Sequence, residues 1–97
     1  MANTFYVGRC ELDLFIENSH SLKEKRRIIK SLKERMKNQY NIAICEYGDM
    51  SLWQRSQLGL VSCGNERSIV DATLKRAIEF LKHVHSVSLL NFTIEIL

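Results

Sequence analysis

The sequence contains no proline, only four glycines and no long run of apolar residues. No segment approaches the roughly 18 consecutive apolar residues that a membrane-spanning helix needs. The first ten residues also lack the basic leader and the apolar core of a secretory signal peptide. We therefore expect a cytoplasmic protein that has no membrane partner.

Sequence motifs for enzyme chemistry are missing as well. There is no glycine-rich phosphate loop, no nucleophile elbow and no Walker lysine. Cys10, Cys45 and Cys63 lack the paired spacing of a zinc site or a redox motif, and each lies in an apolar, strand-like run. We expect them to be buried, reduced thiols. The sequence thus predicts a non-catalytic protein without a cofactor or a metal site.

The pattern of apolar residues predicts a single domain over residues 1–97. A chain of 97 residues that is 45% hydrophobic is long enough for one core and too short for two. Alternating apolar and polar residues predict strands, and apolar residues at steps of three and four predict helices. The expected strands are 5–17, 42–48, 52–63 and 86–97, and the expected helices are 22–40 and 66–84. This order predicts an α+β, ferredoxin-like βαββαβ sandwich, with a four-stranded antiparallel sheet and two helices on one face.

The helix-free face of this sheet is expected to be polar. The middles of the central strands carry Glu11, Asp13 and Gln57. RNA readers of the same topology have aromatic residues there, on which bases stack, so we expect no RNA binding on this face. The apolar residues expected on the core side of the last strand are Leu90, Phe92, Ile94 and Ile96.

Both helices have candidate N-terminal caps. Ser21 followed three residues later by Glu24 is a capping box, in which the serine oxygen accepts from the Glu24 amide and the glutamate reaches back to the Ser21 amide. The first helix should therefore begin at Leu22. The second helix is expected to be capped by Asn65, or by Ser68 with an acidic residue three positions on.

The first helix carries an unusual concentration of positive charge. Eight of the fourteen Lys and Arg residues lie between Lys23 and Lys37, with only two acidic residues among them. Four fall within about 60° of one another on a helical wheel, which makes a stripe rather than a ring. A face that serves only solubility would mix the two signs, so the segregation favours a binding role. The candidate nucleic-acid-binding residues are Lys23, Arg26, Arg27, Lys30, Lys33 and Lys37.

Lys25 differs from these residues because it points into the apolar stripe of the helix. A lysine in that position must either extend past the end of the helix or pair with a carboxylate from the sheet below.

Two segments carry a family resemblance. The S-L-K-E-K-R-R opening of the first helix (21–27) and the D-x-x-x-W-Q-R segment (49–55) resemble the YlxP-like family of bacterial domains of unknown function. The resemblance covers almost the whole chain. It implies a ferredoxin-like domain, often encoded beside translation and ribosome-maturation factors, with no established catalytic activity.

By position, the resemblance also highlights Asp49, Trp53, Gln54 and Arg55 as candidate contacts for a partner or ligand. From the residues alone, Trp53 could be a lid on the core, an anchor for a dimer or a platform on which a ligand stacks.

Two functional hypotheses follow. The first is a non-catalytic module that binds RNA or a ribosomal subunit, with the basic helix lying along the phosphate backbone. The second is a structural or regulatory homo-oligomer, such as a homodimer, that uses its open sheet face or edge strand, with or without a small anionic ligand. An acidic protein surface would select the same lysines and arginines as RNA.

Overall fold

The computed structural model describes residues 3–97; Met1 and Ala2, which the predicted domain includes, lie outside the described residues. The elements follow one another in the order β1 (Tyr6–Phe15), α1 (Leu22–Gln39), β2 (Ala43–Tyr47), β3 (Arg55–Gly64), α2 (Arg67–Lys82) and β4 (Ser88–Ile96). This is the expected β-α-β-β-α-β order. Within residues 3–97, no helix is both long enough and apolar enough to cross a membrane.

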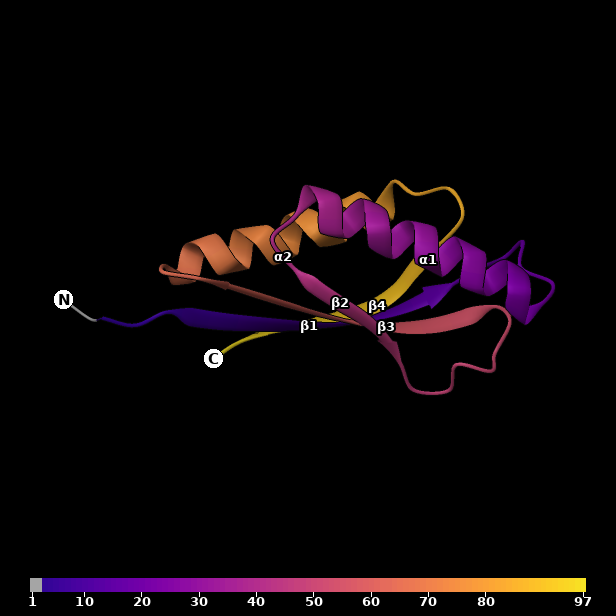
Figure 1. Cartoon of the computed structure of the whole chain (residues 1–97), viewed down its shortest axis with the longest axis horizontal. Coiled ribbons are helices and arrows are strands. Elements are labelled where there is room, and N and C mark those ends of the chain that lie inside the picture. Colours follow the sequence, from indigo (N-terminus) through magenta and orange to yellow (C-terminus); the bar gives the residue numbers. More distant parts are fainter. Residues whose placement is uncertain (1–2) are drawn as a thin grey trace.

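The four strands form one antiparallel sheet in the order β2-β3-β1-β4. Residue Leu12 in the middle of β1 is opposite Leu58 of β3 and Phe92 of β4. Both helices lie on the same side of the sheet, and the other side is not covered (Figure 1). The predicted α+β, ferredoxin-like sandwich is therefore confirmed.

The core lies between the sheet and the two helices. Alternate residues of the strands point toward the helices, and each helix buries one stripe of apolar residues against them. As expected, Cys10, Leu12, Leu14 and Ile16 of the first strand segment are buried. Their helix partners are Ile29, Leu32 and Met36 of α1 and Val70, Leu74, Ala77, Ile78 and Leu81 of α2. Burial of each such Val, Leu or Ile side chain contributes about 1.5–3 kcal/mol.

Helix α2 approaches β1 closely at Gly8. A Cβ atom at this glycine would lie 2.6 Å from Cγ1 of Val70 and 2.8 Å from Cδ1 of Leu74. Only a residue without a side chain therefore allows α2 to rest on the sheet at this point.

The N-terminal cap predicted for α2 is wrong. The capping residue is Glu66, and its side chain makes no capping hydrogen bond. Ser68 lies inside the first turn, and Asn65 precedes the cap. The predicted helix also extends two residues too far, since α2 ends at Lys82.

The last strand differs from the alternation that the sequence predicts. Its pairing with β1 shifts between Asp13, opposite Asn91, and Leu14, opposite Leu89, so that Leu90 has no partner. Because of this bulge, Leu89 packs against the core while Leu90 is 52% exposed. Phe92, on the same edge strand, is 42% exposed. Ile94 and Ile96 pack against the core as predicted.

Two of the three cysteines were wrongly expected to be buried. Cys10 is buried, whereas Cys45 and Cys63 are exposed. Both lie at positions where strand alternation directs the side chain to the helix-free face of the sheet.

Candidate functional site

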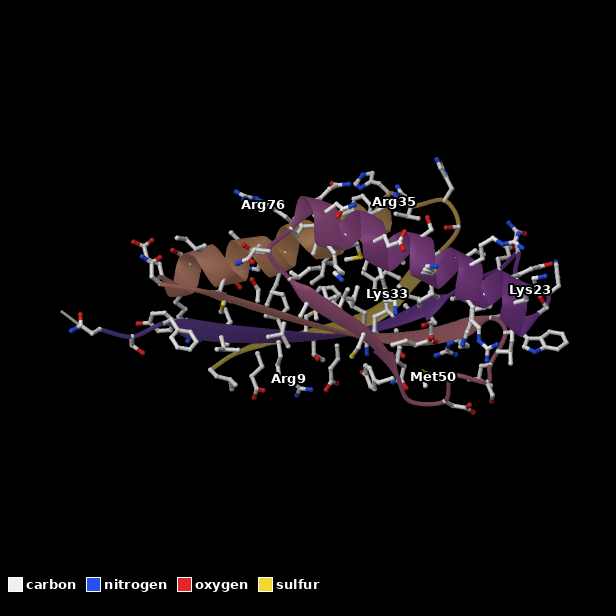
Figure 2. All side chains as sticks on the ribbon, in the orientation of Figure 1. Arg9, Lys23, Lys33, Arg35, Met50 and Arg76 are labelled. Atoms are coloured by element: carbon white, nitrogen blue, oxygen red, sulfur yellow. The ribbon has the colours of Figure 1, made fainter. Side chains whose placement is uncertain are left out.

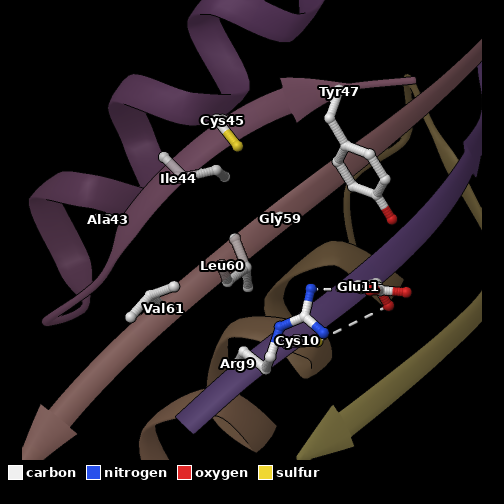
Figure 3. A pocket seen from close by; sticks show the side chains of 10 residues that line it. All are labelled: Arg9, Cys10, Glu11, Ala43, Ile44, Cys45, Tyr47, Gly59, Leu60 and Val61. Carbon is white, nitrogen blue, oxygen red and sulfur yellow. Dashed lines mark hydrogen bonds and ion pairs between the residues drawn. The ribbon is translucent and has the colours of Figure 1, made fainter. Parts of the chain in front are cut away.

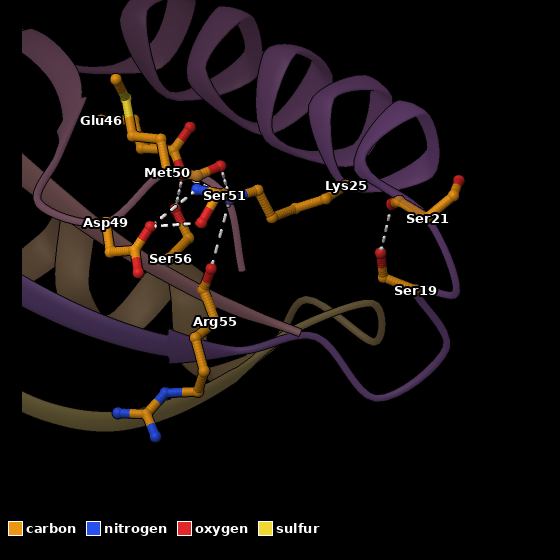
Figure 4. A network of polar contacts seen from close by, with 9 residues as sticks. All are labelled: Ser19, Ser21, Lys25, Glu46, Asp49, Met50, Ser51, Arg55 and Ser56. Carbon is orange, nitrogen blue, oxygen red and sulfur yellow. Dashed lines mark hydrogen bonds and ion pairs between the residues drawn. The ribbon is translucent and has the colours of Figure 1, made fainter. Parts of the chain in front are cut away.

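Lys25 is wholly buried beneath the first turns of α1. Its Nζ donates to Oε2 of Glu46 at 3.0 Å and to the main-chain oxygens of Met50 at 2.8 Å and Arg55 at 3.4 Å (Figure 4). Oε2 of Glu46 also accepts from the Ser56 hydroxyl at 2.9 Å. Of the two alternatives expected for Lys25, the structure shows pairing with a carboxylate of the sheet. This lysine joins α1, β2 and the start of β3, and its charge is not available to an external partner.

The β2–β3 loop, residues 48–54, begins with a turn that requires glycine. Gly48 has a φ of 78°, in the left-handed region. Asp49 then accepts from the amide and the hydroxyl of Ser51, at 3.0 and 2.5 Å. Both bonds lower the pKa of the Asp49 carboxyl, and the bond from the Ser51 hydroxyl has the larger effect. Asp49 therefore shapes the loop.

The end of the β2–β3 loop is bonded to the segment between β1 and α1. The side-chain amide of Gln54 donates to the Glu17 carbonyl at 2.9 Å, and the main-chain carbonyl of Gln54 accepts from the Ile16 amide at 2.8 Å. The strand predicted from residue 52 therefore begins only at Arg55. Gln54, like Asp49, holds the loop in place.

The other two candidate contact residues are accessible. The Trp53 side chain is 55% exposed, so it does not cover the core. The Arg55 side chain is exposed and lines a shallow hollow on the helix-free face with Asp13 and Gln57. Asp49 and Gln54 of the D-x-x-x-W-Q-R segment thus bond the loop through their side chains, while Asp49, Trp53 and Arg55 are all exposed.

The basic residues of α1 form an accessible surface that we call the basic flank: Lys23, Arg26, Arg27, Lys30, Lys33 and Lys37. All are exposed except Lys33, which is half-buried. Within residues 3–97, no carboxylate lies within 4 Å of any of them. Elsewhere on the surface, Arg9, Lys75 and Lys82 are ion-paired at 2.9–3.2 Å, whereas Arg55, Arg67 and Arg76 form no ion pair in the described part of the chain. The basic flank is therefore a line of cations that form no ion pair within residues 3–97, although the exposed Glu34 lies among them, between Lys30 and Lys37.

The basic flank is directed away from α2. Arg35 lies on the opposite side of α1, and its guanidinium carbon is 5.1 Å from the centre of the Phe80 ring of α2. Helix α1 packs over β2, the outer strand on its side of the sheet. In Figure 2, Arg35 lies above α1 and Lys33 lies below it, toward the sheet. The basic flank therefore follows the outer edge of the molecule, beside β2.

The helix-free face of the sheet contains a shallow hollow of about 320 Å³. Gly59 forms its floor, and the surrounding residues include Ala43, Cys45, Tyr47 and Val61 (Figure 3). Partial burial, and then the carboxylates of Glu11 and Asp13, raise the pKa of Tyr47. The phenol is therefore neutral at physiological pH, and the hollow is largely apolar.

An ion pair borders this hollow, with Arg9 and Glu11 2.9 Å apart. In the part of the chain that the structure describes, no three His, Cys, Asp or Glu side chains are grouped so that they could hold a metal ion.

Comparisons with known proteins place this chain among proteins without an assigned activity. Residues 7–94 match the family described as "Protein of unknown function (DUF503)". The chain is 32% identical over 75 residues to "Uncharacterized protein YlxP" of Bacillus subtilis (strain 168), which covers 77% of this chain and 82% of that protein. Among solved structures, the de novo designed protein Foldit4 is 12% identical, with a TM-score of 0.48, and the match covers 97% of this chain and 94% of Foldit4.

Proposed function

The chain belongs to the DUF503 family of proteins of unknown function, and we propose that it is a non-catalytic module that binds the phosphate backbone of RNA, free or within a ribosomal subunit. YlxP of Bacillus subtilis is a similar protein. The binding surface in this proposal is the basic flank. The observation that carries it is that six cations lie along one helix and that none of them has a carboxylate within 4 Å among residues 3–97.

The geometry of α1 favours an extended polyanion as the partner. Lys23 and Lys37 are fourteen residues apart, so the basic flank is ~21 Å long at 1.5 Å per residue. Long, flexible lysine and arginine side chains in such a line contact phosphates and contribute affinity, but they do not read base sequence. The flank therefore supports binding with little sequence preference.

The salt dependence of binding tests this mechanism. Contacts to four to six phosphates release counterions, which gives a slope of roughly −3 to −5 for log affinity against log salt concentration. We expect the purified protein to co-sediment with ribosomal subunits, and to bind labelled RNA in anisotropy titrations, at low salt. The affinity should fall steeply toward physiological salt.

Charge reversal locates the surface. The variant Arg26→Glu, Lys30→Glu, Lys37→Glu changes three exposed residues of the basic flank and should lose binding. The matched control, Lys75→Glu, Arg76→Glu, Lys82→Glu, makes the same change of charge on exposed residues of α2 and should keep most of it. Undiminished binding by the α1 variant, or equal loss in both variants, would show that the basic flank is not the binding surface.

A second candidate function is self-association through the helix-free face of the sheet. The observation that favours it is the apolar hollow around Gly59, beside which Val61 is 46% exposed. In this case Val61→Asp should lower the molar mass measured by light scattering to that of the monomer. A monomer at high micromolar concentration of the unchanged protein would rule this function out.

A further inference from the structure

The β2–β3 loop exposes three large apolar side chains at one end of the molecule. Met50, Leu52 and Trp53 are all exposed, and neighbouring exposed apolar residues mark interaction sites. Figure 2 shows Met50 and Lys23 at the same end, with Lys23 on the first turn of α1. Lys25, whose Nζ donates to the Met50 carbonyl, holds this loop against the first turns of α1, where the basic flank begins (Figure 4).

This loop is held in one conformation although its side chains face solvent. Lys25 bonds to the main chain at Met50 and Arg55, on either side of Trp53. Gln54, the next residue after Trp53, is bonded through both its side chain and its main chain to residues 16 and 17. The backbone that presents the indole ring is therefore ordered before any partner arrives, which reduces the entropy lost on binding.

Three exposed cations lie on the helical turns to which this loop is bonded. Lys23, Arg26 and Arg27 are neighbours of Lys25 in the sequence, and no carboxylate pairs with them in the described part of the chain. An accessible aromatic ring and unpaired cations on two segments bonded to each other are a combination with which proteins bind single-stranded nucleic acid, because the ring stacks on a base while the cations contact phosphates.

From this arrangement we infer that Trp53 stacks on an unpaired base of single-stranded RNA whose phosphates lie on the N-terminal part of the basic flank. The inference rests on the proposed function and narrows its substrate class. A duplex keeps its base faces stacked inside the helix, so unpaired loops, bulges or ends are the RNA segments that this site selects. The length of the basic flank favours RNA over a short acidic peptide, which would need fewer cations.

The fluorescence of the protein tests the stacking directly, because Trp53 is the only tryptophan in the chain. Three probes are titrated at low salt: a short single-stranded oligoribonucleotide of mixed sequence, the corresponding blunt duplex, and inorganic polyphosphate. We expect the single strand to quench the emission of Trp53. Polyphosphate should bind without quenching, because it offers charge and no base.

Substitutions at Trp53 separate stacking from charge. Trp53→Ala should weaken binding of the single strand by at least about fivefold, the lower end of the range for one stacked base. It should leave the affinity for polyphosphate unchanged. Trp53→Phe keeps an aromatic ring and should retain most of the affinity, measured by the anisotropy of labelled RNA. Circular dichroism of both variants checks that the fold is intact.

The outcomes distinguish this inference from the proposed function. If charge reversal on α1 abolishes RNA binding while Trp53→Ala binds as tightly as the unchanged protein, the flank binds RNA and the stacking inference is wrong. Equal quenching by the duplex also overturns it. If neither RNA nor polyphosphate binds, both proposals fail. Stronger quenching by an acidic peptide of Glu and Phe than by the single strand would overturn the assignment to RNA.

Discussion

The Nζ atom of Lys25 lies 3.0 Å from Oε2 of Glu46, and the whole lysine side chain is buried. A cation at the centre of a basic sequence motif is thus part of the core, while its neighbours Lys23 and Arg26 face solvent. A buried ion pair is costly to form, and removal of one partner leaves the other charge desolvated and unpaired. Lys25 also supplies hydrogen bonds to both sides of the β2–β3 loop.

Lys25→Met should strongly destabilise the fold. Methionine nearly preserves the length of the side chain but removes the charge and the three hydrogen bonds. The Glu46 carboxylate, whose side chain is only 13% exposed, then keeps the Ser56 hydroxyl as its single hydrogen-bond donor. We expect a loss of about 3–5 kcal/mol in the free energy of unfolding, measured by urea titration.

The matched control for this variant is Lys23→Met, two residues away on the exposed surface, which should change stability by no more than about 0.5 kcal/mol. The double variant Lys25→Met, Glu46→Gln should recover part of the loss, because no unpaired charge is then buried. Equal stability of the two single lysine variants would show that the ion pair does not stabilise the fold.

Ser21→Ala should destabilise the protein by about 1 kcal/mol, the usual cost of losing an N-cap. The Ser21 hydroxyl accepts from the Glu24 amide at 3.1 Å, as the sequence predicts. The Glu24 carboxylate accepts from the amide of His20 at 2.8 Å, one residue before the predicted partner.

Ser68→Ala is the comparison, because the sequence around this serine resembles an N-cap but Ser68 is not the capping residue of α2 in the structure. Its effect should stay within about 0.5 kcal/mol. A larger loss for Ser68→Ala than for Ser21→Ala in thermal or urea unfolding would contradict both assignments.

Cys10 should react far more slowly with thiol reagents than the other cysteines. Burial, and secondarily the Glu11 carboxylate, raise its pKa to about 11, so little thiolate forms at pH 8. Cys45 and Cys63 are exposed. A disulfide reagent at pH 8 should therefore titrate two thiols in the folded protein and the third only in denaturant. Rapid reaction of all three in the folded state would contradict the buried position.

The same raised pKa gives a pH dependence of stability. The folded state holds the Cys10 proton more tightly than the unfolded chain, whose thiol has the usual pKa near 9.0. The contribution of Cys10 to stability is therefore complete below pH 9 and is lost as the pH rises toward 11. A Cys10→Ala variant should lack this part of the alkaline dependence in urea titrations at several pH values.

Much of the fold could be predicted because local patterns decide it. The alternation at Cys10, Leu12 and Leu14 and the capping box at Ser21 specify their elements without help from distant residues. The errors occur where tertiary contacts override the pattern. Leu90 is unpaired because of a bulge that only the register with β1 reveals, and β3 begins late because Gln54 is bonded to the segment after β1.

The candidate site could be predicted in part for the same reason. The periodicity of α1 identified the basic flank and the inward direction of Lys25. The loop-forming roles of Asp49 and Gln54 depend on partners in the folded loop, Ser51 and Glu17, and the motif alone does not reveal them. The contact between Arg35 and Phe80 joins two helices far apart in the sequence, so no local signal could have indicated it.

The position of the basic flank beside β2 also affects whether two copies of this protein can associate through the edge of the sheet. β2 is the outer strand of the sheet, five residues long, and an unpaired edge is a template for adding a strand from another chain. Two copies joined antiparallel at this edge would bring their two basic flanks close together, and like charges repel over about 10 Å at 0.1 M salt. We therefore expect the lysines and arginines of α1 to oppose aggregation through β2, and we expect this effect to weaken as salt or a polyanion neutralises them.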